Sequence, residues 1–246
     1  MAGDDEKYGD RWADVYDEWT VRFARLGDPE TAASRLVELA GAGRALELGI
    51  GTGRVALPLA SKGVEVHGID SSQQMVDKLR DKPGGNEIPV TIGDFAEVPV
   101  EGSFRLIYVV FNTVFALQSQ DDQVRCFESV AAHLDDDGVF VVEAFVPDLT
   151  LYDRGQRVDA NTVEDDVAAL TLARLDAAEQ RTLASIQILQ GGQDRSYPVR
   201  IRFAWPSELD LMARLAGLRL RDRWSGWDGA PFDSSSTAHV SVYAKG

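Results

Sequence analysis

The sequence predicts an α/β fold, in which a mostly parallel sheet of seven strands carries helices on both faces. An N-terminal helical lid and a small antiparallel insert are predicted to accompany this sheet. From residue 44 onward, short strand patterns alternate with helical patterns, which is typical of right-handed βαβ units. These strands are continuously apolar, as expected for strands that are buried on both faces. The alternation stops between about residues 150 and 205, where extended runs follow one another.

Length, charge and cysteine content exclude several classes of protein. The 246 residues suit one large domain, and the net charge of −15 disfavours a nucleic-acid partner because no basic run offsets it. A single cysteine, Cys126, rules out a disulfide within the chain, and we expect no metal site. The acidic N-terminus lacks the apolar core of a signal peptide, and no apolar run is long enough to span a bilayer. We therefore expect a cytoplasmic protein without a membrane partner.

Residues 1–43 are predicted to form the helical lid. Aromatic and apolar side chains recur in steps of three and four from Tyr8 to Leu26, so they share one helical face. Residues 27–29 break this helix, and a second amphipathic helix follows it as far as Gly41.

The remaining elements follow in order. Residues 44–149 form the predicted core, with strands at 45–48, 64–69, 90–92, 104–111 and 139–145. Its first helix is predicted at 54–61. A second helix, capped by Ser71, carries Met75, Val76 and Leu79, and a third spans 120–134 and ends in a turn at 135–138. Residues 150–205 form the insert, with strands at 157–163, 168–174, 181–189 and 196–204. The last part, 206–246, returns to the core with a helix ending at Leu215 and strands at 218–224 and 237–244.

A glycine-rich loop follows the first strand of the predicted core. It reads Glu47-Leu48-Gly49-Ile50-Gly51-Thr52-Gly53, and glycines there let the backbone approach a ligand. A dinucleotide site would place the third glycine at position 54, which is Arg54. An acid, Asp70, ends the second strand, where a carboxylate can accept both ribose hydroxyls. Asp94 ends the third strand, in position to accept from an adenine amino group.

These residues resemble the class I S-adenosylmethionine-dependent methyltransferases, which have a Rossmann-like fold. The pattern Glu47-x-Gly49-x-Gly51-x-Gly53, Asp70 and Gly93-Asp94-Phe95 carry the resemblance. It implies S-adenosyl-L-methionine as cofactor and S-adenosyl-L-homocysteine as product. The implied cofactor-binding residues are Tyr16, Trp19, Glu47, Gly49, Gly51, Gly53, Arg54, Asp70, Ser71, Met75, Gly93, Asp94, Phe95, Phe111 and Asn112.

The sequence narrows the class of methyl acceptor. After the fourth strand it reads Phe111-Asn112-Thr113-Val114, without the Pro-Pro motif of enzymes that methylate base amines, and Cys126 is expected to be a buried thiol. The chain is similar to N-methyltransferases of amino sugars in antibiotic pathways, including the lincosamide type. Tyr8 and Tyr16 in Tyr-x7-Tyr-Asp, the run 111–117 and the end 236–243 carry this likeness. It implies N-methylation of a small amine in natural-product biosynthesis. An O- or C-methyltransferase and a non-catalytic nucleotide-binding protein are the alternatives.

The resemblance also implies which residues serve the acceptor. The candidate catalytic residues are Tyr8, Tyr16 and Phe115, and the candidate substrate contacts are Tyr8, Phe115, Glu143, Phe145 and His239. Several have a structural alternative: the tyrosines as core aromatics, Glu143 in an ion pair, and His239 as a buried histidine rather than a general base. The insert is predicted to form a substrate wall or the interface of a homo-oligomer.

Overall fold

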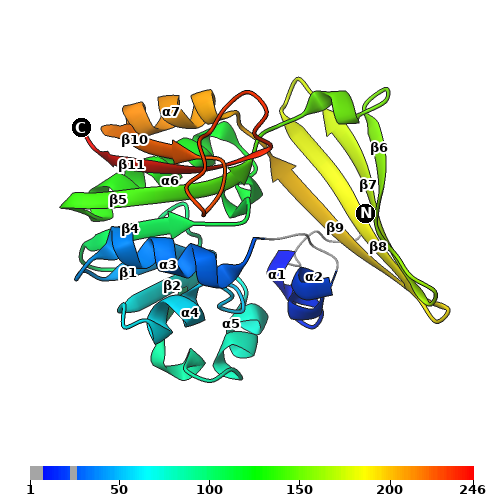
Figure 1. Ribbon diagram of the computed structural model, residues 1–246, viewed down its shortest axis with the longest axis horizontal. Helices are drawn as coiled ribbons and strands as arrows, with labels where there is room; N and C mark the ends of the chain where they lie inside the picture. Colours follow the sequence, from blue (N-terminus) through cyan, green and yellow to red (C-terminus); the bar gives the residue numbers. More distant parts are fainter. Residues whose placement is uncertain (1–7, 23–26) are drawn as a thin grey trace.

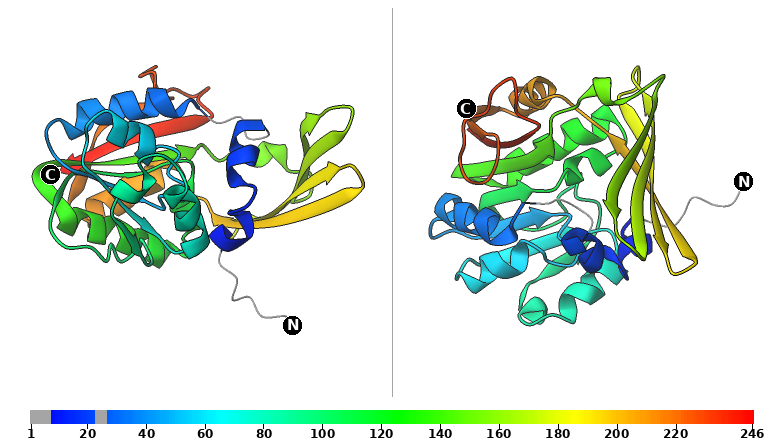
Figure 2. Two further views of the ribbon diagram at one scale, coloured as in Figure 1. Left: turned by 90° about the horizontal axis from the view of Figure 1, so that it is seen from below. Right: turned by 45° about the vertical axis from the view of Figure 1, so that its right-hand side comes forward.

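The computed structural model describes residues 8–22 and 27–246, and shows two separate sheets. In Figure 1 the larger sheet lies among helices, and the smaller sheet stands beside it. Two short helices near the N-terminus lie between them (Figure 2). Within the described residues, no helix combines the length and apolar character needed to cross a membrane.

The larger sheet confirms the predicted α/β core. Its seven strands have the order β10-β11-β5-β4-β1-β2-β3. β1 pairs in parallel with β2 and with β4, whereas β11 runs antiparallel to both β5 and β10. The carboxyl ends of the parallel strands therefore meet at one edge, and connections leave β1 and β4 in opposite directions there, where α/β proteins bind ligands. The strands are β1 (Ala45–Leu48), β2 (Val66–Asp70), β3 (Val90–Ile92), β4 (Phe104–Val109), β5 (Leu134–Phe145), β10 (Leu218–Trp224) and β11 (Ala238–Lys245).

Helices cover both faces of this sheet. Buried Leu36, Leu59 and Leu79 bring α3, α4 and α5 into one apolar cluster, while Phe127 and Met212 bring α6 and α7 into the other. The two clusters lie on opposite sides of the strands, which explains why the strands are apolar on both faces. The helices are α3 (Pro29–Ala40), α4 (Ala56–Ser61), α5 (Gln73–Arg80), α6 (Gln120–His133) and α7 (Pro206–Leu215), and the short 3-10 turns are η1 (Gly85–Glu87), η2 (Thr113–Ala116) and η3 (Leu149–Leu151).

The N-terminal region differs from the single long helix that the periodicity predicts. It forms two helices, α1 (Tyr8–Trp12) and α2 (Tyr16–Arg22), and the end of the predicted helix, including Leu26, lies outside the described residues. The chain turns between them, where Val15 N donates to Trp12 O at 3.0 Å. This bend places the indoles of Trp12 and Trp19 edge to face, with ring centroids 4.9 Å apart, so tertiary packing overrides the helical period.

Two boundaries in the core also differ from the prediction. Ser72, not Ser71, caps α5, because its hydroxyl accepts the backbone N–H of Met75 at 3.2 Å. Asp70 Oδ1 accepts the N–H of Ser72 at 2.8 Å and so turns the chain one residue later than expected. The acidic run at 135–137, predicted as a turn, belongs to β5, which begins at Leu134 opposite Phe104 of β4.

The predicted insert forms the second sheet, an antiparallel meander in the order β6-β7-β8-β9. Buried Ile186, Ile188 and Tyr197 face the lid and share one apolar cluster with Trp12 and Trp19. The insert and the lid therefore pack against each other. The strands are β6 (Gln156–Val163), β7 (Val167–Asp176), β8 (Arg181–Gln190) and β9 (Gln193–Arg202).

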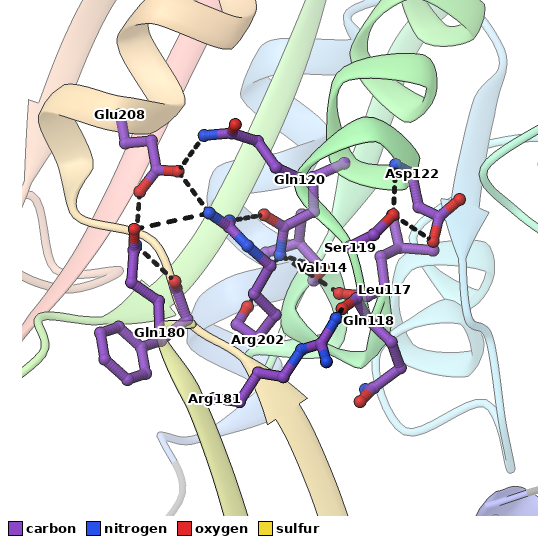
Figure 3. A network of polar contacts seen from close by, with 12 residues as sticks. Val114, Leu117, Gln118, Ser119, Gln120, Asp122, Gln180, Arg181, Arg202 and Glu208 are labelled. Carbon is purple, nitrogen blue, oxygen red and sulfur yellow. Dashed lines mark hydrogen bonds and ion pairs between the residues drawn. The ribbon is translucent and has the colours of Figure 1, made fainter. Parts of the chain in front are cut away.

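A buried polar network holds the insert to the core (Figure 3). Arg202, at the end of β9, donates to Gln123 Oε1 of α6 at 2.6 Å and to Glu208 Oε1 of α7 at 2.8 Å. Gln180 donates to Glu208 Oε2 at 2.7 Å. Burial tends to raise the pKa of Glu208, but hydrogen bonds from Gln180, Arg202 and Gln120 outweigh it and lower that pKa. The network fixes the base of the insert against α6 and α7.

Candidate functional site

The glycine loop lies directly after β1, at the carboxyl edge of the sheet. Gly49, Gly51 and Gly53 have φ angles of 71°, 54° and 78°, in the left-handed region that glycine adopts without strain. A Cβ atom at Gly49 would lie 2.5 Å from Thr113 Cγ2 on η2. The close approach of η2 therefore requires glycine at this position. It also brings the end of β4 against the loop.

Asp70 lies at the end of β2 and connects the loop to α5. Its Oδ2 accepts Gly51 N–H at 2.7 Å and its Oδ1 accepts Ser72 N–H at 2.8 Å. Burial raises the pKa of this carboxyl, and the backbone hydrogen bonds oppose that shift. Each carboxylate oxygen has a second lone pair, so Asp70 can still accept from ligand hydroxyls.

Glu47 lies on β1 and is almost fully buried, with 2% of its surface exposed. Its Oε2 accepts the hydroxyl of Tyr108 at 2.9 Å. Burial raises the pKa of Glu47 to about 8, and the hydrogen bond from Tyr108 opposes this shift. A positively charged ligand at the loop would favour the ionised form, so Glu47 is suited to a cation.

The residues after β3 lie next to this loop. Gly93 N donates to Asp70 O at 2.9 Å, and exposed Asp94 accepts Ala96 N–H at 2.9 Å. Phe95 Cε1 comes within 4.0 Å of the position that a Cβ at Gly49 would occupy. The structure thus brings the predicted acids of β2 and β3 together with the glycine loop. Ser71 is exposed beside them, and Met75 is buried under Gly51.

The turn after β4 is strained and is held by β5. Phe111 and Asn112 have φ angles of 56° and 62°, which are uncommon for residues other than glycine. Glu143 Oε2 accepts Phe111 N–H at 3.0 Å, and Asn112 Oδ1 accepts Phe145 N–H at 2.7 Å. The other oxygen of Glu143 accepts the indole N–H of Trp227 at 2.9 Å. Glu143 therefore supports the turn.

A cavity of about 500 Å³ adjoins the loop through Thr113. It lies between the lid, the end of β4 and the insert, and its size suits a small organic molecule. The residues that line it come from four segments and are Arg11, Tyr16, Trp19, Phe111, Asn112, Thr113, Ala116, Gln118, Phe145, Ile186, Pro198, Val199, Arg200 and Ile201.

The lid is closed over the loop by polar contacts. Asp17 on α2 accepts the hydroxyl of Thr52 at 2.6 Å, and its other oxygen lies 2.7 Å from Lys82 Nζ. Lys82 also donates to Thr52 O at 2.8 Å. On α1, Asp10 accepts the hydroxyl of Ser72 at 2.5 Å. These residues were not predicted from the sequence, although Asp17 belongs to the Tyr-Asp pair at positions 16 and 17.

Three of the predicted lid and acceptor residues, Tyr16, Trp19 and Phe145, line the cavity. Phe111 and Asn112, predicted as cofactor contacts, also line it, and the guanidinium of Arg54 lies 5.7 Å from the centroid of the Phe111 ring. Burial raises the pKa of the Tyr16 phenol well above its ordinary value, so this hydroxyl stays protonated. The side chain of Tyr8 lies outside the described part of the structure.

Three of the predicted substrate contacts, Phe115, Glu143 and His239, do not line the cavity, and His239 follows the alternative of a buried histidine. Phe115 is fully buried, because η2 turns its ring into the core. The centroid of this ring lies 5.1 Å from that of Phe145. Glu143 is turned toward its two structural donors. His239 is fully buried on β11, with Nδ1 2.8 Å from Ser241 Oγ, and burial lowers its pKa to about 4.

The observed groups fit S-adenosylmethionine. Carboxylates end β2 and β3 for a ribose and an adenine amine, and Glu47 suits the positive charge of the methionine part. Among the described residues, the indole Nε1 of Trp19 is buried without a hydrogen-bond partner. Such a donor costs about 1–3 kcal/mol unless a ligand accepts from it, and a carboxylate would do so.

Comparisons with known proteins agree with this fit. A family model described as "Methyltransferase domain" matches residues 45–138. The structure of the CcbJ methyltransferase from Streptomyces caelestis is 40% identical, with a TM-score of 0.93 over 99% of both chains. The cypemycin N-terminal methyltransferase of a Streptomyces species is 27% identical over 197 residues, or 78% of each chain.

A third relative is similar to this chain in fold alone. The amino pentose methyltransferase CalS10 from Micromonospora echinaspora, solved with the cofactor bound, is 20% identical. Its TM-score is 0.71, and the match covers 93% of this chain and 96% of that one. The 40% identity to CcbJ over 99% of both chains, the matching family model and the geometry of the loop agree. The chain is a member of the class I S-adenosylmethionine-dependent methyltransferases.

Proposed function

We propose that this enzyme methylates an amine nitrogen of a small natural product. One observation carries the choice of nitrogen: among the described residues that line the cavity, none is Asp, Glu, His, Lys or Cys. A neutral amine attacks without losing a proton first, whereas a phenol or a carbon acid needs a base in reach. One relative named above, the cypemycin N-terminal methyltransferase, supports an amine acceptor.

The chain's own residues bind and align the two reactants. Gly49–Gly53, Glu47, Asp70 and Asp94 would hold S-adenosylmethionine, which supplies an electrophilic methyl group on a positively charged sulfur when it is bound. Tyr16 and Trp19 close the cavity above the loop and exclude water. Because the Tyr16 hydroxyl stays protonated, it acts as a hydrogen-bond donor to a ligand oxygen or acceptor from the amine, and not as a base. Alignment and water exclusion supply the acceleration.

The insert has a place in this proposal as a wall of the acceptor cavity. Ile186 and residues 198–201 line the cavity, which supports the substrate-wall alternative from the sequence. The homo-oligomer and the cytoplasmic location stay predictions.

The test has two parts. Isothermal titration calorimetry with S-adenosylmethionine should show binding that Asp70→Asn weakens by about 2 kcal/mol, because the amide nitrogen cannot accept hydrogen bonds. The matched control Asp77→Asn, an exposed carboxylate on α5, should leave the dissociation constant unchanged. A mass-spectrometric screen of amines, phenols and amino sugars should then show a gain of one methyl group on amines alone. Methylation of phenols only would contradict the proposal.

A further inference from the structure

Three aliphatic side chains of the insert form one wall of the acceptor cavity. Ile186 lies on β8, and Val199 and Ile201 lie on β9, the edge strand of the second sheet. In the register of these strands Ile186 pairs with Tyr197, and side chains alternate between the two faces of a strand. Ile186, Val199 and Ile201 therefore share one face of the sheet, which is the face that packs on the lid. We call these three residues the aliphatic wall.

The opposite face of the same strands is polar at this level. Ser185 and Gln187 alternate with Ile186 on β8, and Ser196 pairs with Gln187 from β9. Gln187 donates to Ser185 Oγ at 2.6 Å and to Ser196 Oγ at 2.8 Å, so these groups bond to one another. Such alternation is typical of an antiparallel strand with one face turned toward an apolar interior. The sequence of β8 and β9 thus directs hydrocarbon toward the cavity.

The protein covers this wall incompletely. Ile186 is buried, but Val199 and Ile201 are only half-buried. Val199 packs against the apolar cluster of the lid, and Ile201 packs against an apolar cluster of the core, as Phe145 does. The cavity therefore lies where two apolar clusters meet. Apolar surface in contact with water is unfavourable, and a hydrocarbon group in the cavity would remove it from water.

Hydrogen bonds to the core hold the wall in place. Gln118, just after η2, donates to Arg200 O at 2.8 Å. Gln123 of α6 is fully buried and donates to Arg202 O at 2.8 Å. These bonds fix the backbone of β9 on both sides of Ile201. The wall is thus preorganised, which lowers the entropy cost of binding a ligand against it.

Polar and apolar groups of the cavity come from different elements. Asn112 and Thr113 belong to the turn after β4, next to the glycine loop, whereas the aliphatic wall belongs to the insert. Arg200 alternates with its two aliphatic neighbours and so lies on the other face of β9. Both Arg200 and Arg11 are exposed, so water screens their charges. One end of the cavity is therefore polar and close to the cofactor loop, and the insert end is apolar.

We propose that the methyl acceptor carries a hydrocarbon group, an alkyl chain or an aromatic ring, in addition to its amine, and that the aliphatic wall binds this group. The inference rests on the proposed amine methylation and names the substrate class within it. With the hydrocarbon group against the insert, the amine lies at the end of the cavity that adjoins Thr113 and the glycine loop.

A binding experiment tests the hydrocarbon site without knowledge of the natural acceptor. The protein, loaded with S-adenosylhomocysteine and also without it, is titrated in a calorimeter with heptylamine and with 2-(2-methoxyethoxy)ethylamine. The second amine has the same charge and chain length, but two ether oxygens replace methylene groups. We expect heptylamine to bind at least about tenfold more tightly, because each methylene withdrawn from water raises affinity by about threefold to fourfold.

Variants assign this preference to the wall. Val199→Thr/Ile201→Thr should lose most of it, and Val199→Thr alone, which keeps the shape of the side chain, should reduce it at least about twofold. Their affinity for S-adenosylhomocysteine should stay unchanged, which shows that they are folded. The matched control is Val158→Thr/Leu183→Thr, which makes the same kind of change at exposed positions of the same sheet and should keep the full preference.

The contrary outcomes are equally definite. Equal binding of the two amines by the wild-type protein overturns the inference, as does failure of heptylamine to bind. A preference that both wall variants retain in full, or that the control loses to the same extent, also overturns it. Because the titrations without cofactor report on the cavity alone, a failure of the hydrocarbon site is separate from a failure to bind S-adenosylmethionine.

A turnover experiment separates the two proposals further. Cyclohexylamine and glucosamine both carry an amine on a six-membered ring, but only the first ring is a hydrocarbon. A preference for cyclohexylamine of at least tenfold in kcat/KM, reduced in the wall variants, supports the inference. Equal or preferential methylation of glucosamine overturns the inference and leaves amine methylation standing. Where neither amine is methylated, the binding comparison alone decides the hydrocarbon site.

Discussion

The carboxylate of Glu143 on β5 accepts the backbone N–H of Phe111 at the end of β4, at 3.0 Å. The backbone of Phe111 lies in the left-handed region, a conformation that costs about 1–3 kcal/mol for a residue other than glycine. The hydrogen bond from its N–H to the Glu143 side chain stabilises this conformation. This contact fixes the turn that separates the cofactor loop from the acceptor cavity.

Replacing Glu143 by Gln should lower both stability and turnover. The amide offers one acceptor and one donor to two N–H groups, from Phe111 and Trp227, so one donor loses its partner. We expect a loss of about 1–3 kcal/mol in the free energy of unfolding and a several-fold fall in kcat. Thermal denaturation and steady-state kinetics measure these. Trp227→Phe leaves the hydrogen bond between Glu143 and Phe111 intact, so it should destabilise the protein with less effect on kcat. A larger fall in kcat for Trp227→Phe than for Glu143→Gln would argue against the role of Glu143 in holding the turn.

The pKa of Glu47 predicts pH-dependent cofactor binding. Because burial raises this pKa to about 8, the free protein holds a proton there at neutral pH, and a positively charged ligand releases it. The affinity for S-adenosylmethionine should therefore rise between pH 6 and pH 8 and level off above. Calorimetry in two buffers of different ionisation enthalpy should detect about one proton released at pH 7. Glu47→Gln should abolish both effects, and an unchanged proton count in that variant would assign the proton to another group.

Tyr16→Phe should lower turnover without lowering stability. The ring that packs at 6.3 Å from Trp19 is retained, and only the hydroxyl at the cavity is lost. We expect kcat/KM to fall about tenfold, equivalent to about 1.4 kcal/mol, while the melting temperature changes little. Burial raises the pKa of this phenol, so wild-type activity should show no loss from its ionisation up to pH 10. Unchanged kinetics in the variant would reduce Tyr16 to a packing residue.

His239 should make the protein less stable in mild acid. Its pKa is about 4 in the fold, mainly because of burial and secondly because of Arg223, with Asp210 opposing, against an ordinary value of 6.5. The unfolded chain binds the proton more readily, so the stabilisation is complete above pH 6.5 and is lost as the pH falls toward 4. The loss is about 3 kcal/mol. Urea denaturation at several pH values should show it in the wild type and in the control His67→Gln, but not in His239→Asn.

Lid closure should depend on salt through Asp17. Its partners are Thr52 and Lys82 on the cofactor side, and the ion pair with Lys82 is partly exposed, so salt screens it. Asp17→Asn should raise the KM for S-adenosylmethionine several-fold and make it less dependent on NaCl. Asp14→Asn removes a neighbouring lid contact, to Lys78, that is open to solvent and should change little. Similar effects of both variants would mean that lid charge, and not the contact to the loop, matters.

The sequence predicts where the residues of the glycine loop lie better than it predicts which residues line the cavity. Glu47, Gly49 and Asp70 follow from local order, because each is placed by the strand that precedes it. Arg11 and Arg200 line the same cavity only because the lid packs on the insert, and no local pattern encodes that packing. The burial of single side chains also depends on tertiary contacts that no local pattern encodes.

His239 and Phe115 illustrate it. The sequence places His239 on a terminal strand, but the antiparallel register of β11 with β5 decides which face its ring takes, and that face is buried. Phe115 follows the fourth strand as expected, yet η2 turns its side chain inward. The lid helix breaks between Trp12 and Trp19, and the bend brings the two indoles edge to face.

The shared cluster of Trp12, Trp19 and Tyr197 has a kinetic consequence. The two lid helices, α1 and α2, contact the glycine loop through Asp17 and line the acceptor cavity through Tyr16 and Trp19, so donor and acceptor exchange pass through the same gate. Opening this lid to release the spent donor would also open the acceptor cavity. Successive methylations of one acceptor molecule are therefore interrupted by its release, and the enzyme is expected to work distributively, one methyl group per encounter.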